Sequence, residues 1–412
     1  MILKRRFCFL FIFCGVISSS FAQELNIGVS VSTSAQREAF YTLARDFEAR
    51  HPNTQVNFTA LSSEDYKLAF PNMIATDKRF DVLYWHAGQR LFHFVEKDLI
   101  EPIDDLWLEK DFDDAFDENV KQNLNYNGRF YAVPISYYQI GFYYSKEVFE
   151  RLSLNEPSSW QEFLAVCESI KASGVAPIFI GTESNWPATA WFDYLNLRLN
   201  GLAFHLALTQ GEVPFNDERV RLTLKTLYEL KEREFFIANH QDFQWNESLP
   251  LLSRGLVGMS LIGNYVIQDI RKDMLPKFGF FPFPQISESV GKYEEAPIDI
   301  LVIPKRAKNL SLAKAFLAFV ANHDVQNKLN KKLGVISPHK LSQQQTSELT
   351  KEAYLELSTA DGFSQFFDRD ANEAFAGDIM HAIDKFMVNG DIATTIESLE
   401  LARSEHFPSL AN

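Results

Sequence analysis

The stretch DVLYWHAGQ, residues 81–89, is the part of the chain from which the fold can best be predicted. Its first half is a short apolar run typical of a buried strand, and a helical pattern begins at Gln89 after a small Ala-Gly turn. A strand that turns directly into a helix indicates an α/β protein, in which ligands bind where the carboxyl ends of strands meet the next helices. Tyr84 and Trp85 stand at this point and offer flat apolar faces with polar tips. The stretch is therefore a candidate binding rim, with burial in the core as the alternative.

The residues before this stretch show the same alternation of strand and helix. Residues 25–31 alternate between apolar and polar side chains, as expected for a strand, and an amphipathic helix follows that stops at His51-Pro52. A second strand at residues 56–60 and a second helix at about residues 64–76 lead to the opening stretch. The order β-α-β-α-β predicts a parallel sheet.

The residues after the opening stretch predict a second αβ unit. An Asn127-Gly128 pair indicates a hairpin. A new series of helices and strands begins at Ser158-Ser159, which are typical helix caps. The chain is too long for one ordinary core and has no low-complexity linker. We therefore expect two lobes between which the chain crosses more than once.

The first 22 residues have the pattern of a cleavable secretory signal peptide. Basic residues at positions 4–6 precede an apolar run at residues 7–17 that is too short to span a bilayer, and small residues stand at positions 20 and 22. A lipoprotein anchored at Cys14 is the alternative, but the bulky residues before this cysteine argue against it. We expect a free soluble protein in the periplasm, with residues 1–22 removed.

Composition excludes several classes of function. The formal net charge of −14 opposes binding to nucleic acid and to anionic membranes. After removal of the signal peptide only Cys167 remains, so an internal disulfide cannot form. The helical apolar pattern around Cys167 predicts a small buried side chain rather than a nucleophile. No later segment is long and apolar enough to span a membrane.

No catalytic or metal-binding motif stands out in the sequence. The patterns HExxH, GxSxG and CxxC are missing. Gly258 and Gly263 have the spacing of a P-loop, but Asn264-Tyr265 replace its lysine and hydroxyl residue. The nine histidines are scattered singly, without the spacing of metal ligands. We predict no cofactor and no metal site, whereas a glycosidase remains open because such enzymes often lack short signatures.

Aromatic side chains make up 14% of the chain, and several follow predicted strands. Sugar rings have apolar C–H faces and hydroxyl rims, which are matched by aromatic faces and by polar side chains. Burial in the core is the competing interpretation, and with 37 phenylalanines it is preferred for that residue type. The aromatic candidates for ligand contact are Tyr84, Trp85, Tyr137, Tyr138, Trp186, Trp191 and Tyr265.

Five segments together carry a family resemblance. They are FEARHPN at 47–53, DVLYWHAG at 81–88, NGRFYAVP at 127–134, PSSWQEF at 157–163 and GLVGMSLIGNY at 255–265. In this order they resemble motifs of the family 1 extracellular solute-binding proteins of bacterial ABC importers, the carbohydrate-binding, maltose-binding-protein-like group. Two departures concern the identity of the ligand. The residues APID at 296–299 stand where the family often has a Gly-Gly pair, and Tyr265 replaces a tryptophan.

The resemblance implies a two-lobed α/β fold, the type II periplasmic-binding-protein fold. Its ligand cleft lies between the lobes, which are joined by crossover hinge segments and close on the ligand. We place the crossings near Pro134, Pro297 and Pro338. The expected N-terminal lobe comprises residues 23–134 and 297–338, and the expected C-terminal lobe comprises residues 135–296 and 339–412.

The resemblance also implies a function without chemistry. The protein would capture a mono- or oligosaccharide as a monomer and present it to the permease subunits of an ABC importer in the inner membrane. One alternative is a periplasmic sugar-sensing subunit for a membrane receptor kinase, which would share every site residue. A second alternative is an exported glycosidase or lyase, which would require two close carboxylates or a base–acid pair.

Ligand-binding roles are expected where strands end. Trp85 would stack on the sugar, and His86 or Gln89 would bond a hydroxyl, with a purely structural hydrogen bond as the alternative for His86. Strand geometry lets only one of Tyr84 and Trp85 face the cleft, because neighbouring residues point to opposite sides. Tyr137 and Tyr138 lie at the hinge, and only one of them should face the cleft. Trp186 and Trp191 belong to the second lobe, with burial in the core as the alternative for one of them.

Five polar residues complete the predicted site. Helix capping is the alternative role for Ser34, and stabilisation of a helix N-terminus is the alternative for Asp65. Asp299 would supply a side-chain acceptor where relatives use backbone. The five residues are Ser32, Ser34, Asp65, Asn264 and Asp299.

Overall fold

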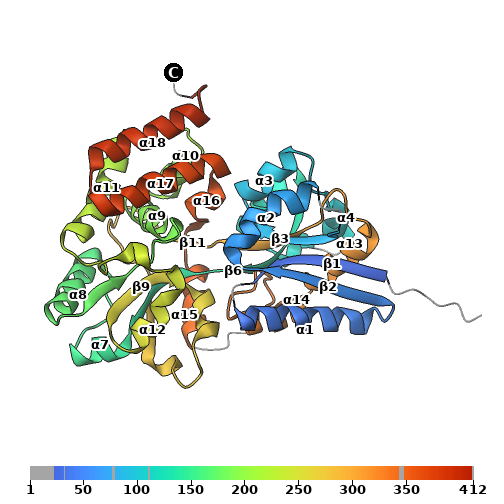
Figure 1. The fold of residues 1–412 in the computed structure, drawn as a ribbon, viewed down its shortest axis with the longest axis horizontal. Coiled ribbons are helices and arrows are strands. Elements are labelled where there is room, and N and C mark those ends of the chain that lie inside the picture. The colour runs from blue at the N-terminus through green and yellow to red at the C-terminus, as the bar shows by residue number, and fades with distance from the viewer. Residues whose placement is uncertain (1–22, 32, 77–78, 110–111, 343–347, 411–412) are drawn as a thin grey trace, which may run out of the picture.

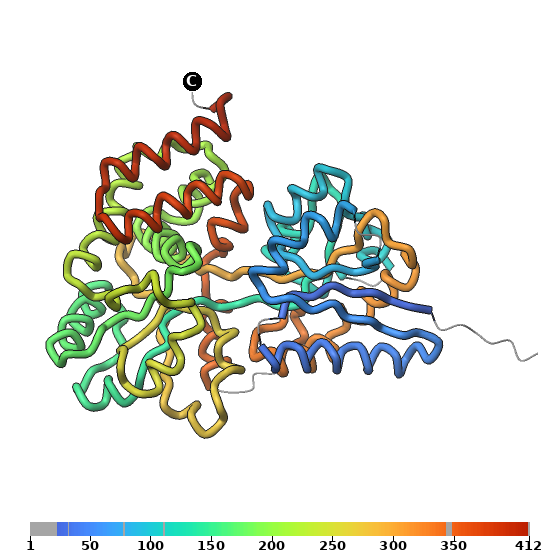
Figure 2. The backbone as a smooth tube through the Cα atoms, in the orientation of Figure 1, coloured from blue at the N-terminus to red at the C-terminus, as the bar shows by residue number. Residues whose placement is uncertain are grey.

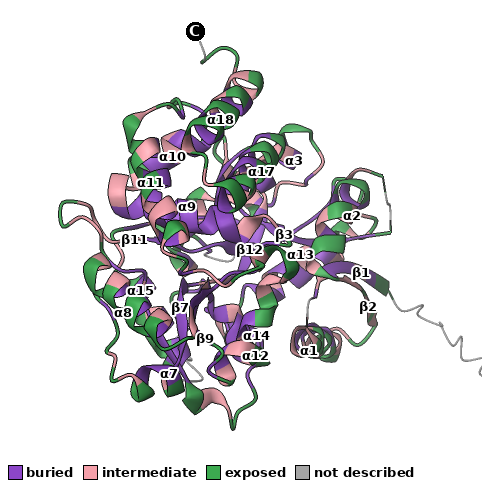
Figure 3. Ribbon diagram, turned by 60° about the vertical axis from the view of Figure 1, so that its left-hand side comes forward, coloured by how far each residue is buried: buried purple, intermediate pink, exposed green. Residues whose placement is uncertain are grey.

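Two α/β lobes lie side by side in the computed structural model of this chain (Figure 1). In each lobe helices pack on a sheet, and the buried side chains gather between sheet and helices (Figure 3). The predicted two-lobed α/β architecture is confirmed. The predicted signal peptide and Ser32 lie outside the described residues, which are 23–31, 33–76, 79–109, 112–342 and 348–410.

The first sheet has the strand order β2-β1-β3-β12-β6. As predicted, β1 (Gln23–Ser30), β2 (Thr54–Leu61) and β3 (Val82–His86) run parallel. In contrast, β12 (Ile298–Val302) pairs antiparallel with both β3 and β6 (Ala132–Tyr137). The predicted parallel arrangement is therefore confirmed for β1, β2 and β3, but the whole sheet is mixed, because β12 enters it from the second lobe and runs in the opposite direction.

Helices cover both faces of the first sheet, with α1 and α14 on one side and α2 and α3 on the other (Figure 1). The predicted hairpin at Asn127-Gly128 is confirmed as β4 (Asn125–Tyr126) and β5 (Arg129–Phe130). The helices are α1 (Ser34–Arg50), α2 (Ser63–Ala75), α3 (Gln89–Glu96), α4 (Asp104–Glu109), α5 (Phe112–Ala115), α6 (Glu118–Gln122), α13 (Leu310–Val320) and α14 (His323–Leu333).

The start of α1 is fixed by a reciprocal pair of hydrogen bonds. The Thr33 hydroxyl accepts from the Gln36 N–H at 3.2 Å, and the Gln36 side chain accepts from the Thr33 N–H at 3.3 Å. This capping box satisfies two of the amide groups that a helix leaves open at its first turn. The prediction that Ser34 caps this helix is therefore wrong. Ser34 is the first helical residue, and its side chain is exposed.

The carboxylate of Asp81 holds three segments of the first lobe together. It accepts hydrogen bonds from the backbone N–H groups of Asn26, Lys308 and Asn309 at 3.0, 3.1 and 3.0 Å. These bonds fix β3 beside β1 and anchor the segment that leads into α13. Asp81, at the head of the stretch that predicts the fold, is thus a structural residue.

The second sheet has the strand order β10-β7-β9-β8. Its strands are β7 (Ile140–Ser145), β8 (Ala176–Phe179), β9 (Val257–Gly263) and β10 (Phe278–Phe281). β8 and β9 are parallel, whereas β7 runs antiparallel to both of its neighbours. Strand β7, which directly follows the first crossing, therefore lies in the interior of the sheet. Its pairing on both sides anchors this end of the hinge in the second lobe.

Ten α-helices of the described chain pack on the second sheet or on one another. Ser159 caps α8 as predicted, and Cys167 in this helix is buried, as predicted. None of the helices in the described ranges is long and apolar enough to cross a membrane. The helices are α7 (Lys146–Arg151), α8 (Trp160–Ala172), α9 (Trp186–Asn200), α10 (Leu202–Thr209), α11 (Glu218–Glu232), α12 (Ser248–Ser253), α15 (Glu348–Ser358), α16 (Phe367–Asp370), α17 (Glu373–Asn389) and α18 (Ile392–His406), with the short 3-10 turns η1 (His240–Asp242), η2 (Trp245–Glu247), η3 (Asn264–Asp269) and η4 (Leu275–Lys277).

The chain crosses between the lobes more than once (Figure 2). Strand β6 continues through Pro134 to Tyr137, so the first crossing lies at 138–139, later than expected. The second crossing runs from β11 (Tyr293–Glu295) to β12, and β11 pairs with β13 (Gly362–Ser364). Apart from the position of the first crossing, we keep the residue ranges predicted for the two lobes as a proposal.

Candidate ligand-binding site

A cavity of about 120 Å³ lies between the two lobes. The carboxyl ends of β1 and β3 and the first turns of α1 and α2 form its wall in the first lobe. The carboxyl ends of parallel strands are where α/β sheets place their ligands. The lining residues are Ser30, Thr33, Gln36, Ser63, Glu64, Lys67, Tyr84, His86, Tyr138, Trp186, Trp245, Tyr265, Asp269, Phe366, Asp368 and Arg369.

An aromatic wall, which we define as Tyr138, Tyr265, Trp245, Trp186 and Phe366, faces the cavity from the crossing and the second lobe. The ring centroids of Tyr138 and Tyr265 lie 5.2 Å apart, and those of Tyr265 and Trp245 lie 5.5 Å apart. Trp186 continues the row at 6.0 Å from Trp245 and 5.3 Å from Phe366. These edge and tilted contacts hold the rings in place and leave apolar faces for a ligand.

The imidazole of His86 is buried at the end of β3 and lines the cavity. Its Nδ1 has no hydrogen-bond partner among the described residues. Burial, followed by the positive charges of Arg369, Arg90 and Lys67, lowers the pKa of His86 well below its ordinary value. The ring is therefore neutral at pH 7, and its role in bonding a ligand hydroxyl stays a prediction that this geometry favours.

The carboxylate of Asp299 organises the polar side of the site without lining the cavity itself. The hydroxyls of Tyr84 and Tyr138 both donate to this carboxylate. Arg369 Nη1 lies 3.3 Å from Asp299 Oδ1, and the Ser136 hydroxyl lies 3.5 Å from Oδ2. Burial raises the pKa of Asp299 to about 6, while Arg369 acts to lower it. Asp299 thus orients two tyrosines that do line the cavity.

Further ion pairs border the cavity. Arg90 Nη2 lies 2.7 Å from Asp368 Oδ2, which joins α3 of the first lobe to α16 of the second. Burial acts to raise the pKa of Asp368, but Arg90, Lys67 and Arg369 together hold it below its ordinary value. Lys67 also pairs with Glu64 at 3.1 Å. These charged side chains are therefore paired with opposite charges, which suits a neutral polar ligand.

Trp85 is not a ligand-stacking residue in this structure, contrary to prediction. Its ring stacks on Phe70 with centroids 3.6 Å apart and planes 8° apart, and its Nε1 donates to the Arg90 carbonyl at 3.0 Å. Alternation along β3 explains the outcome, because Tyr84 and His86 point to the cavity and Trp85 points into the core.

Trp191 is likewise a core residue rather than a site residue. It is buried on α9 against Phe142 and Phe236, with ring centroids 5.5 and 5.1 Å away. Trp186 begins the same helix one turn earlier and does line the cavity. The helix therefore places only its first tryptophan at the site.

Two predicted residues lie at a different cavity. Gln89 and Tyr137 line a separate space of about 600 Å³ that is also lined by the crossing residues Ala296 and Ile298. Of the two tyrosines at the first crossing, only Tyr138 reaches the candidate site. The prediction that one of them faces the cleft agrees with this arrangement.

Two of the remaining predicted polar residues, Asp65 and Asn264, have structural partners. Asp65 is exposed and accepts from the Ser62 hydroxyl at 2.6 Å, next to the N-cap of α2. Asn264 is buried, and its backbone and side chain bond the backbone of Gln139 in the first crossing. Asp65, Ser34 and Asn264 are therefore not brought to the cavity.

Sequence reasoning missed several lining residues. Trp245 lies in a polar stretch without a strand or helix pattern, so its only signal is an isolated aromatic ring in a loop. Arg369 has no sequence pattern that would place it at the cleft. Thr33, Gln36 and Lys67 have no signal beyond their place at helix starts.

A sequence profile described as the bacterial extracellular solute-binding protein family matches residues 32–327, which is more than half of the chain. The chain belongs to this family. The resemblance carried by the five segments is thereby confirmed. The prediction that this solute-binding protein is no enzyme is also supported, because the family consists of receptors.

Relatives and solved structures agree with this assignment. An uncharacterized ABC transporter extracellular-binding protein of Pyrococcus horikoshii is 28% identical over 328 residues, covering 77% of this solute-binding protein and 72% of the relative. The maltotriose-binding protein of Pyrococcus abyssi is 22% identical over 308 residues, covering 73% and 63%. The structure of the bacterial solute receptor AcbH, described as exclusively preferring β-D-galactopyranose, matches at a TM-score of 0.88 and 25% identity, covering 95% of this chain and 100% of its own.

Proposed function

We propose that this solute-binding protein captures a sugar between its lobes and delivers it to an ABC importer. The observation that carries the proposal is the aromatic wall, which faces His86 and Arg369 across one cavity. Aromatic rings match the C–H faces of a sugar, and polar side chains match its hydroxyls. Closure of two lobes then buries the ligand.

The size of the cavity favours a small sugar. The cavity volume of about 120 Å³ is small beside the roughly 300–1,000 Å³ of ordinary ligand pockets. The likeness to AcbH, whose described preference is β-D-galactopyranose, supports a monosaccharide as the ligand class.

Delivery to the permease subunits of an importer and location in the periplasm complete the proposal. The family and the ABC-transporter relative support the first, and the signal-peptide pattern of residues 1–22 supports the second. Pull-down of the inner-membrane permease by the sugar-loaded protein tests the partner. Retention of a membrane receptor kinase in place of a permease would favour the sensor function.

A thermal-shift screen of the full chain tests the ligand class. A ligand that binds only the native state raises the melting temperature. We expect shifts with one or a few monosaccharides and smaller shifts with longer oligosaccharides. Shifts caused by amino acids or peptides, with no carbohydrate active, would reject the proposal. Turnover of a bound oligosaccharide into products would reject the purely binding function.

A further inference from the structure

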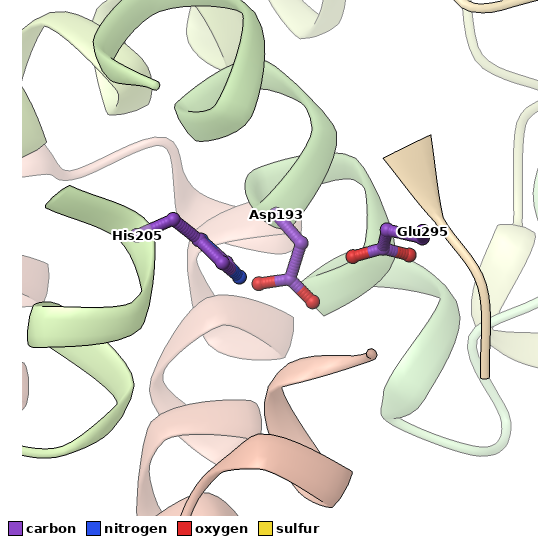
Figure 4. A group of neighbouring side chains, drawn as sticks. All are labelled: Asp193, His205 and Glu295. Atoms are coloured by element: carbon purple, nitrogen blue, oxygen red, sulfur yellow. The ribbon is translucent and has the colours of Figure 1, made fainter. Parts of the chain in front are cut away.

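Three buried side chains of the second lobe bring their polar atoms together, away from the sugar cavity. They are Asp193 on α9, His205 on α10 and Glu295 on β11. One ligand atom from each lies within 4.8 Å of the others. Figure 4 shows Asp193 between the other two, with the His205 ring nitrogen directed at one of its carboxylate oxygens and Glu295 beside the other.

Most of these polar atoms lack other partners. His205 Nε2, Asp193 Oδ1 and both side-chain oxygens of Glu295 are buried, and beyond one another they have no hydrogen-bond partner in the described part of the chain. In contrast, Asp193 Oδ2 accepts from the Phe367 N–H at 3.0 Å, and His205 Nδ1 lies 3.1 Å from the Asn196 amide. Buried carboxylates without a cation or a donor are costly, so this cluster calls for a positively charged occupant.

The arginines nearby cannot supply that charge, because they are already paired. Arg198 bonds Glu294, the neighbour of Glu295, and Arg90 bonds Asp368. Two acidic groups thus face each other without a protein cation.

We propose that Asp193, His205 and Glu295 bind a divalent transition-metal ion, with Zn²⁺ as the best fit. Zn²⁺ is bound by imidazole nitrogen together with carboxylate oxygen, whereas Mg²⁺ and Ca²⁺ prefer oxygen alone. Its two positive charges neutralise the two carboxylates. In a tetrahedral site the ligand atoms lie about 3.4 Å apart, so the three side chains move inward by roughly one ångström.

The hydrogen-bond partner of His205 decides which ring nitrogen can bind a metal. The side-chain amide of Asn196 lies 3.1 Å from His205 Nδ1. The Asn196 oxygen accepts from Asn200 Nδ2 at 2.7 Å, so the two amides must turn together. Nδ1–H then donates to Asn196, and Nε2 is free for the metal.

The bound ion has a structural consequence for the hinge. Glu295 is the last residue of β11 and directly precedes the second crossing. Asp193 also holds the backbone of Phe367, two residues before the cavity residue Arg369. A metal ion therefore ties the start of the crossing to the segment that carries Arg369. This link does not depend on which sugar the cavity binds.

Metal binding by the full-length chain tests the proposal. After treatment with a chelator and removal of the chelator, Zn²⁺ should raise the melting temperature by several degrees and bind at about one ion per chain. His205→Gln should abolish both effects. His381→Gln, a change at an exposed position on α17, should behave like the wild type.

Two results would overturn the proposal. The first is an equal response of wild type and His205→Gln to Zn²⁺, which would place the metal elsewhere. The second is no response of the wild type to Zn²⁺, or a response to Ca²⁺ alone, which would leave Asp193 and Glu295 as a pair that shares a proton. If His205→Gln fails to fold, anomalous scattering at the zinc edge from wild-type crystals decides: a peak between the three side chains supports the site, and its absence rejects it.

Discussion

The guanidinium of Arg369 lies 3.3 Å from the carboxylate of Asp299, and this ion pair joins α16 of the second lobe to β12 of the first sheet. The two side chains are only 12% and 2% exposed. Tyr84 and Tyr138 donate to the same carboxylate from the wall of the cavity. The pair therefore links the arrangement of the lobes to the shape of the site.

Replacement of Arg369 by leucine should impair both stability and binding. The change leaves Asp299 as a buried charge without a cation, which lowers the free energy of unfolding by about 3–5 kcal/mol. Sugar affinity should fall at least about tenfold, since Arg369 also lines the cavity. Urea unfolding and calorimetric titration measure the two effects. Arg306→Leu, at an exposed position, is the control, and unchanged binding by Arg369→Leu would contradict the assignment.

Trp85→Ala should destabilise the fold without a direct effect on the ligand. The ring stacks on Phe70 in the core, so its removal should cost about 3–5 kcal/mol of unfolding free energy. The molecules that remain folded should keep the wild-type dissociation constant. Calorimetric titration below the unfolding temperature measures this constant. A loss of affinity without a loss of stability would mean that Trp85 contacts the ligand.

Trp245→Ala should have the opposite profile. Trp245 is half-buried in the aromatic wall, so its loss removes one stacking surface and should weaken sugar binding about tenfold or more. Trp160→Ala is a matched control, because Trp160 is also half-buried but lies outside the cavity. Equal affinities of the two variants would remove Trp245 from the proposed site.

Gly88→Ala should disturb the contact between the lobes. Gly88 has φ 75° and ψ −146°, and a Cβ there would lie 3.1 Å from the Arg369 carbonyl as well as against Gln365. Backbone strain of about 1–3 kcal/mol and this clash both oppose the observed arrangement. Gly174→Ala carries similar strain at φ +80°, but no described atom lies within 4 Å of its added carbon. Both variants should therefore lose stability, but only Gly88→Ala should also weaken sugar binding.

The buried carboxyl of Asp370 should give the protein a measurable pH dependence. Burial raises the pKa of Asp370 to about 6, while its bonds to Gln365 act to lower it. The folded state therefore takes up a proton between roughly pH 6 and 4 that the unfolded state does not, so this group favours folding as the pH falls. Relative to Asp370→Asn, the wild type should gain about 0.8 kcal/mol between pH 7.5 and 5.5.

Urea unfolding of both proteins at the two pH values measures this gain. Asp114→Asn, on the exposed face of α5, is the control for removal of a carboxyl group at the surface. A difference between wild type and Asp370→Asn that is constant with pH, or that shrinks on acidification, would contradict the raised pKa.

Local patterns predict most of the fold. The alternation along residues 25–31, the stop at His51-Pro52 and the hairpin at Asn127-Gly128 all correspond to elements of the structure. The direction of β12 could not be predicted. This strand reaches the sheet from another lobe, and its own residues do not indicate whether it pairs parallel or antiparallel. The first crossing was placed too early, since Pro134 is tolerated within β6.

The site was predictable only in part. Tyr84, His86 and Tyr265 were predicted because they stand at strand ends, and all three line the cavity. Periodicity alone could not decide that Trp85 points to the core. Residues joined only by tertiary packing, such as Arg369, gave no signal. The cluster of Asp193, His205 and Glu295 was missed for the same reason: its members are distant in sequence and lack the spacing of a metal motif.

The division of the tryptophans between core and cavity also gives the protein a built-in optical signal. Trp85, Trp107 and Trp191 are buried, and Trp160 packs on Phe163 outside the cavity, so their emission should be a constant background. Trp186 and Trp245 alone of the tryptophans line the cavity in the described chain. Occupancy can therefore be followed by the intrinsic fluorescence of an unlabelled protein, in real time and at low concentration.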